Sequence, residues 1–67
     1  MRGRVKWFDN RKGYGFIRNE VGEEVYVHYT ALRGDGFRGL KHNQVVEYET
    51  ITTDSGKVEA RNVVILK

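Results

Sequence analysis

Apolar and polar residues alternate along most of the chain, and short segments rich in β-branched and aromatic residues are separated by turn-forming residues. No segment sustains the i, i+3, i+4, i+7 spacing of apolar residues that an amphipathic helix requires. The pattern predicts strands at Arg2–Phe8, Tyr14–Arg18, Glu24–Tyr29, Gln44–Thr52 and Lys57–Leu66. One helical turn at Thr30–Leu32 and a glycine-rich loop at Arg33–Gly39 are expected between the third and fourth strands. An all-β chain with short connections favours a small closed barrel, which leaves no strand edge exposed.

The second and third predicted strands separate aliphatic from aromatic residues by face. Successive side chains of a strand point to opposite sides of the sheet, so Val25 and Val27 lie on one side. Tyr26 and His28 lie on the other side. In the second strand the aromatic face holds Tyr14 and Phe16, and the opposite face holds Gly15 and Ile17. If the two strands pair, the aliphatic face is the barrel core and the aromatic face is a patch on the outside.

The opposite assignment, with the rings in the core, has two costs. It would expose the aliphatic residues of both strands, and it would bury His28, whose ring then needs hydrogen-bond partners. An exposed aromatic patch on a small protein is in turn typical of a binding surface. We therefore expect the rings to face outward and to contact a ligand.

The charge of the chain is unevenly distributed. The 67 residues carry a formal net charge of +3, yet residues 1–18 hold six arginines and lysines against Asp9 alone. Because bases stack on rings and phosphates pair with cations, aromatic residues interleaved with basic ones indicate a nucleic-acid ligand. No apolar run is long enough to span a membrane, so no membrane partner is expected. The absence of cysteine suits a cytoplasmic protein, and we expect one domain over residues 1–67, acting as a monomer.

Three segments of the sequence resemble the cold-shock domain family. They are Gly3–Asp9 (GRVKWFD), Lys12–Ile17 (KGYGFI) and Val25–Ala31 (VYVHYTA). Weaker matches continue to Asn62 and Val63, so the resemblance covers essentially the whole chain. It implies a five-stranded antiparallel OB-fold barrel that binds single-stranded RNA and DNA, with a preference for pyrimidine-rich strands, and acts as an RNA chaperone.

The resemblance also implies which residues bind. The stacking residues would be Trp7, Phe16, Tyr26, His28, Tyr29 and Phe37, with Phe8 and Tyr14 as partly exposed neighbours. Lys6 and Lys12 would approach phosphates or base edges. Arg38 is a phosphate contact suggested by its charge and its position in the glycine-rich loop, and not by the motifs.

The sequence departs from the family pattern at several places, one of them the tyrosines at 26 and 29, where phenylalanine is common, and its net charge is basic where many members are acidic. Asp9 stands where asparagine is usual, which replaces a polar contact to a base by a negative charge. The last loop lacks the Gly-Pro-Gln-Ala pattern of the family and reads Gly56–Arg61 (GKVEAR), so no contact is carried over to it.

Catalytic and cofactor chemistry find no support in the sequence. Gly34–Gly39 matches the glycine spacing of a dinucleotide-binding loop, but no helical pattern follows it. The two histidines, His28 and His42, lack a zinc-ligand spacing and a nucleophile to activate, and His42 is expected to be solvated. We therefore expect no enzyme activity, no metal and no cofactor. Two other functions remain open: a barrel that docks a protein partner on its aromatic face, and a module that reads the shape of a nucleic-acid duplex.

Overall fold

The computed structural model describes residues 1–33 and 39–66 and contains the five predicted strands, each bounded within one residue of its predicted ends. They are β1 (Arg2–Asp9), β2 (Tyr14–Asn19), β3 (Glu24–His28), β4 (Val45–Thr52) and β5 (Val58–Ile65). The helical turn is η1, a 3₁₀ helix at Tyr29–Ala31 that follows β3 directly. In the described residues no helix is long and apolar enough to cross a membrane.

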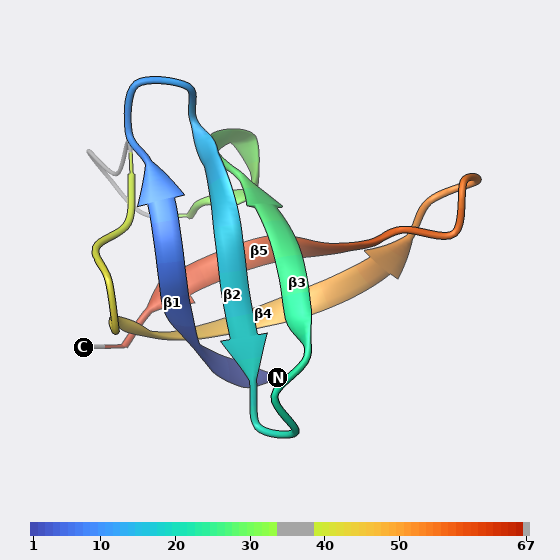
Figure 1. Cartoon of the computed structure of the whole chain (residues 1–67), viewed down its shortest axis with the longest axis horizontal. Coiled ribbons are helices and arrows are strands. Elements are labelled where there is room, and N and C mark those ends of the chain that lie inside the picture. Colours follow the sequence, from blue (N-terminus) through green and yellow to red (C-terminus); the bar gives the residue numbers. More distant parts are fainter. Residues whose placement is uncertain (34–38, 67) are drawn as a thin grey trace.

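The strands close into a barrel in the order β1-β2-β3-β5-β4. Figure 1 shows β1, β2 and β3 as one layer and β4 and β5 crossing behind them. Every pairing is antiparallel except that of β3 with β5, which run parallel through Tyr26 and Glu59. The parallel pair arises because β4 pairs with β1, which leaves β5 as the neighbour of β3. β5 is antiparallel to β4 and therefore runs in the same direction as β3. The predicted five-stranded barrel is thus confirmed, with one parallel seam.

The core consists mainly of aliphatic side chains, which come from all five strands, from η1 and from Leu40. Its members are Val5, Ile17, Val25, Val27, Ala31, Leu40, Val46, Tyr48, Ala60 and Val63. The aliphatic faces predicted for the second and third strands are therefore the inner ones. Tyr48 is the one aromatic ring among them, and within the described residues its hydroxyl has no hydrogen-bond partner. Burial raises the pKa of Tyr48 above its ordinary value.

Two irregularities interrupt the ladders. Between Val5 and Trp7 the pairing with β2 shifts register, because Lys6 is an extra residue in β1. The pairing of β4 with β5 shifts in the same way beside Tyr48, where Asn62 has a φ of 52°. Asparagine tolerates this left-handed conformation better than most residues. Each extra residue changes which side chain faces outward after it, and the first of the two determines the position of Trp7.

Candidate nucleic-acid interface

The outer face of β2 and β3 carries the four predicted rings side by side. Tyr14 pairs across the strands with His28, and Phe16 pairs with Tyr26. The ring centroids of Phe16 and Tyr26 are 6.1 Å apart in an edge-to-face arrangement, and Tyr14 and Tyr26 are stacked at the same separation. All four side chains are partly buried against one another and partly open to solvent. The predicted outward orientation of these rings is confirmed.

Trp7 joins this group through the register shift in β1. Strict alternation from the buried Val5 would turn Trp7 into the core, but the extra residue Lys6 brings it opposite Phe16 on the outer face. Its ring centroid lies 5.7 Å from that of Phe16 and 5.9 Å from that of Tyr14. Trp7 is 41% exposed, so one aromatic surface runs across β1, β2 and β3. We call Trp7, Tyr14, Phe16, Tyr26 and His28 the aromatic face.

Tyr29 extends the aromatic face at the end of β3. Its ring lies 4.6 Å from that of His28 and is 51% exposed. The backbone N–H of Tyr29 donates to the carbonyl of Gly13, and a Cβ at Gly13 would come within 2.6 Å of the tyrosine ring. The His28 ring is fixed as well, because its Nδ1 accepts the Thr30 N–H at 3.4 Å and lies 2.9 Å from the Thr30 hydroxyl. The connection between β1 and β2 thus supports the ring that follows β3.

Asp9 shapes that connection. Its Oδ1 accepts the backbone N–H groups of Arg11 and Lys12 at 2.9 Å each, and its carbonyl accepts the N–H of Gly13. These bonds to Lys12 and Arg11 hold the pKa of the Asp9 carboxyl below its ordinary value. The carboxylate that departs from the family pattern therefore has a structural role in this connection, in which Lys12 is exposed.

Both the side chain and the backbone carbonyl of Lys6 have partners within the protein. Its ammonium forms an ion pair with the carboxylate of Glu24, and the hydrogen bond from Lys6 lowers the pKa of Glu24. The Lys6 carbonyl, at the extra residue of β1, accepts a hydrogen bond from Nδ1 of His42. His42 is exposed as predicted, but this bond was not foreseen. The predicted contact of Lys6 with phosphates or base edges would require its ammonium to reach past Glu24 or to exchange it.

Phe8 differs from the other predicted rings. It follows Trp7 and so points to the inner side, where its partly buried ring packs against the core. It pairs with Gly15, and a Cβ on that glycine would come within 2.2 Å of the Trp7 carbonyl oxygen. Phe8 is thus partly exposed, as expected, and its ring lies on the core side of the sheet, opposite the aromatic face. Phe37 and Arg38 lie outside the described residues.

A protein-family model described as "'Cold-shock' DNA-binding domain" matches residues 1–66 of the chain. The chain belongs to the cold-shock domain family. The family is one of nucleic-acid-binding proteins and is not a family of enzymes. This cold-shock domain has the closed five-stranded barrel that the resemblance of its sequence motifs implies. In its described residues no group of three or more metal-ligating side chains is present.

Bacterial cold shock proteins are similar to this cold-shock domain along its length. Cold shock protein CspB of Geobacillus stearothermophilus is 51% identical over 66 residues, which cover 98% of each chain. Cold shock protein CspD of Bacillus subtilis is 48% identical over 64 residues, 96% of each chain. A cold shock-like protein of Thermotoga maritima is 57% identical over 49 residues, 73% of this chain and 74% of its own.

A solved structure titled "drosophila Unr CSD456" has the same fold. It superposes with a TM-score of 0.74 at 19% identity, over 98% of this chain and 26% of that one. At this identity the likeness concerns the barrel alone.

Two basic residues beside the aromatic face were not predicted as site residues. Arg4 of β1 and Arg18 of β2 are direct cross-strand partners, and both are exposed. The signal was available in part, because residues 1–18 carry six of the twelve arginines and lysines against a single acidic residue. The sequence does not show that Arg4 and Arg18 are neighbours, because this depends on the register in which β1 pairs with β2.

Proposed function

We propose that this cold-shock domain binds single-stranded RNA and DNA by stacking bases on the aromatic face. The carrying observation is the cross-strand series Trp7–Phe16–Tyr26, which presents three neighbouring rings on one surface. Stacking on such rings contributes about 1–3 kcal/mol per base and tolerates most sequences. Tyr29 and the exposed Lys12 extend the surface at one end, and Phe37 and Arg38 are further proposed contacts.

The aromatic face suits single strands better than duplexes. In a duplex the bases already stack on one another, so their faces cannot reach the rings without unpairing. A domain that holds bases in the unpaired state shifts weak hairpins toward the open form by mass action, without ATP. We therefore propose that the protein acts as a non-catalytic RNA chaperone in the cytoplasm, as a monomer of one domain. A preference for pyrimidine-rich strands is part of the proposal.

The fluorescence of Trp7 tests this proposal directly, since it is the single tryptophan of the chain. Titration with a poly-pyrimidine strand is expected to quench its emission, because a base stacks on the indole. The matching duplex is expected to quench it far less at equal concentration. The logarithm of the binding constant should fall with the logarithm of salt concentration by about 0.7 for each phosphate contacted.

An unchanged Trp7 signal with the single strand would refute the proposal. Equal quenching by strand and duplex would favour a module that reads duplex shape. A fluorophore–quencher hairpin of marginal stability tests the chaperone activity separately: added protein should raise its open fraction, and Trp7→Ala should reduce that effect.

A further inference from the structure

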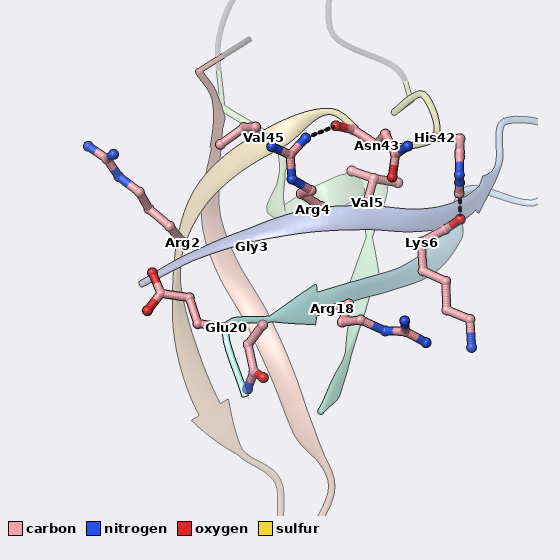
Figure 2. A pocket seen from close by; sticks show the side chains of 11 residues that line it. Arg2, Gly3, Arg4, Val5, Lys6, Arg18, Glu20, His42, Asn43 and Val45 are labelled. Carbon is pink, nitrogen blue, oxygen red and sulfur yellow. Dashed lines mark hydrogen bonds between the residues drawn. The ribbon is translucent and has the colours of Figure 1, made fainter. Parts of the chain in front are cut away.

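A cavity of about 480 Å³ lies along β1, beyond the aromatic face. Its walls come from the end of β2 and from the connection that precedes β4. Four basic side chains line it: Arg2, Arg4, Lys6 and Arg18. Figure 2 shows Arg4 and His42 on one side of the β1 ribbon and Arg18 on the other, with Arg18 extending toward the same end of β1 as Lys6. The cavity is therefore basic and open to a ligand that follows β1.

The cavity begins where the aromatic face ends. Residues on one face of a strand repeat every second position, about 6–7 Å apart. One such step from Phe16 along β2 is Arg18, whose partner on β1 is Arg4 and whose partner on β3 is Glu24. A row of two cations and one carboxylate thus adjoins the row of rings Trp7, Phe16 and Tyr26.

The two arginines of this row have no carboxylate partner among the described residues. Glu24 forms its ion pair with Lys6, while the charge of Arg18 acts on Glu24 only as a lesser cause of its lowered pKa. Arg4 donates to the carbonyl of Asn43 at 3.2 Å, a neutral acceptor. Among the residues that the structure describes, no carboxylate lies within ion-pair distance of Arg4 or Arg18.

We propose that this cavity holds the phosphate backbone of the same bound strand where it continues beyond the aromatic face, with Arg18 and Arg4 as the phosphate contacts. The inference rests on the proposed single-strand binding and adds a second, base-independent part to the site. Rings hold the bases of one segment, and guanidinium groups hold the phosphates of the next. Arginine suits this role because its planar group donates two parallel hydrogen bonds to phosphate oxygens. Glu20 is the one carboxylate among the residues that line the cavity.

The test separates phosphates from bases. An oligothymidylate of about six nucleotides, within the usual range of OB-fold sites, is extended at its 5′ or 3′ end by four abasic nucleotides. A matched extension replaces the abasic phosphodiesters by uncharged methylphosphonates. Binding is followed by Trp7 quenching across a series of salt concentrations. The phosphodiester extension at one end should raise the affinity several-fold and steepen the salt dependence by about 0.7 per phosphate contacted, whereas the uncharged extension should not.

Arg18→Gln and Arg4→Gln should each remove most of that gain and leave the affinity for the unextended strand unchanged. Lys57→Gln is the matched control, because it removes one positive charge from the exposed turn between β4 and β5, which projects away from β1 in Figure 1. It should retain the gain. Denaturant midpoints of the three variants establish that each is folded.

Absence of a gain at both ends, or a gain that survives both arginine substitutions, would overturn the inference. So would an equal loss with Lys57→Gln, because that result indicates net charge and not a localised site. Failure of the unextended strand to quench Trp7 would instead refute the proposed function itself, so the two failures are distinguishable.

Discussion

The inner and outer faces of β1, β2 and β3 are built from alternate residues of the same strands, yet they differ in chemistry. The inner face holds Val5, Ile17 and Val27, each with no exposed surface, and these side chains are aliphatic and compact. The outer face holds rings that touch one another and remain partly open. Along these strands, therefore, a residue that stabilises the core and a residue that faces the ligand are immediate neighbours in the sequence.

This separation allows each face to change with little effect on the other. An aliphatic core is stabilised by the area that it removes from water, and its side chains need no particular partner outside the barrel. The rings gain less from the fold because part of their surface stays in water, and that part is what a base can cover. The predictions below test how complete the separation is.

Truncation of the inner face should have the largest effect. Ile17→Ala removes a fully buried side chain between Phe16 and Arg18, and it is expected to lower the free energy of unfolding by about 2–5 kcal/mol. Denaturant unfolding measures the loss. Ile51→Ala, at an exposed position on β4, is the control and should change stability by less than about 1 kcal/mol. Similar losses for the two variants would contradict the assignment of the inner face.

Truncation of the outer face should affect binding more than folding. Phe16→Ala is expected to weaken binding of a poly-pyrimidine strand by about 1–3 kcal/mol, because it removes the central ring of the aromatic face. It should cost less stability than the roughly 3–5 kcal/mol typical of a core phenylalanine. Titration and denaturant unfolding of the same variant give both values. A variant that unfolds while its folded fraction binds normally would show that the ring belongs to the core.

Gly13 is important both for stability and for the binding surface, and its replacement should reduce stability and strand binding together. It has a φ of +81°, which costs a residue with a Cβ about 1–2 kcal/mol, and its Cβ would collide with the ring of Tyr29. We expect Gly13→Ala to lower stability by about that amount and to weaken strand binding as well. Gly22→Ala is the matched control, since Gly22 has a φ of +86° with no atom within 4 Å of the added Cβ. It should lose stability alone, as read by unfolding and titration.

The smallest effect should come from the carboxylate at the border of the aromatic face. The hydrogen bond from Lys6 favours the charged form of Glu24, so its pKa in the folded state lies below the ordinary 4.5. Its contribution to stability is therefore present above pH 4.5 and is lost as the pH falls through the lower, folded value. Glu24→Gln should flatten the pH dependence of stability in that acidic range and remove the small contribution of the ion pair at neutral pH.

Asp9 is a second carboxyl whose pKa is lowered, by the backbone N–H groups of Lys12 and Arg11. Asp9→Asn therefore serves as the comparison, and the double variant should be flatter than either single one. Carboxyl resonances followed by NMR across the same pH range assign each part. A Glu24 carboxyl that titrates at or above its ordinary pKa would exclude the ion pair with Lys6 in solution.

Much of the barrel could be predicted from the sequence because its signals are local. Alternation within β2 and β3 identified both faces, and glycine and asparagine marked the turns. The outward position of Trp7 could not be derived in this way, because alternation from Val5 points it inward. It depends on the extra residue Lys6, whose carbonyl is then satisfied by His42, far away in the sequence. The family resemblance, and not the pattern, assigned Trp7 to the site.

The features that the sequence did not show depend on register and on closure of the barrel. Arg4 and Arg18 are fourteen positions apart, and only the pairing of β1 with β2 makes them neighbours. The parallel seam between β3 and β5 was missed because it results from the return of β4 to β1. A pattern of apolar residues reports which side of a strand is buried, but it does not report which strands adjoin.

The order of strands around the barrel has a consequence for how the chain folds as it is synthesised. β1, β2 and β3 are consecutive and pair with one another through short turns, so the layer that carries the aromatic face needs only local contacts. The inner side of that layer is closed by β4 and β5, which reach it across most of the length of the chain. Because contacts between distant residues form slowly, we expect the β1-β2-β3 layer to form before β4 and β5 cover its apolar side. The interval between the emergence of His28 and that of Ile65 from the ribosome is then the period in which the nascent chain is most prone to aggregate.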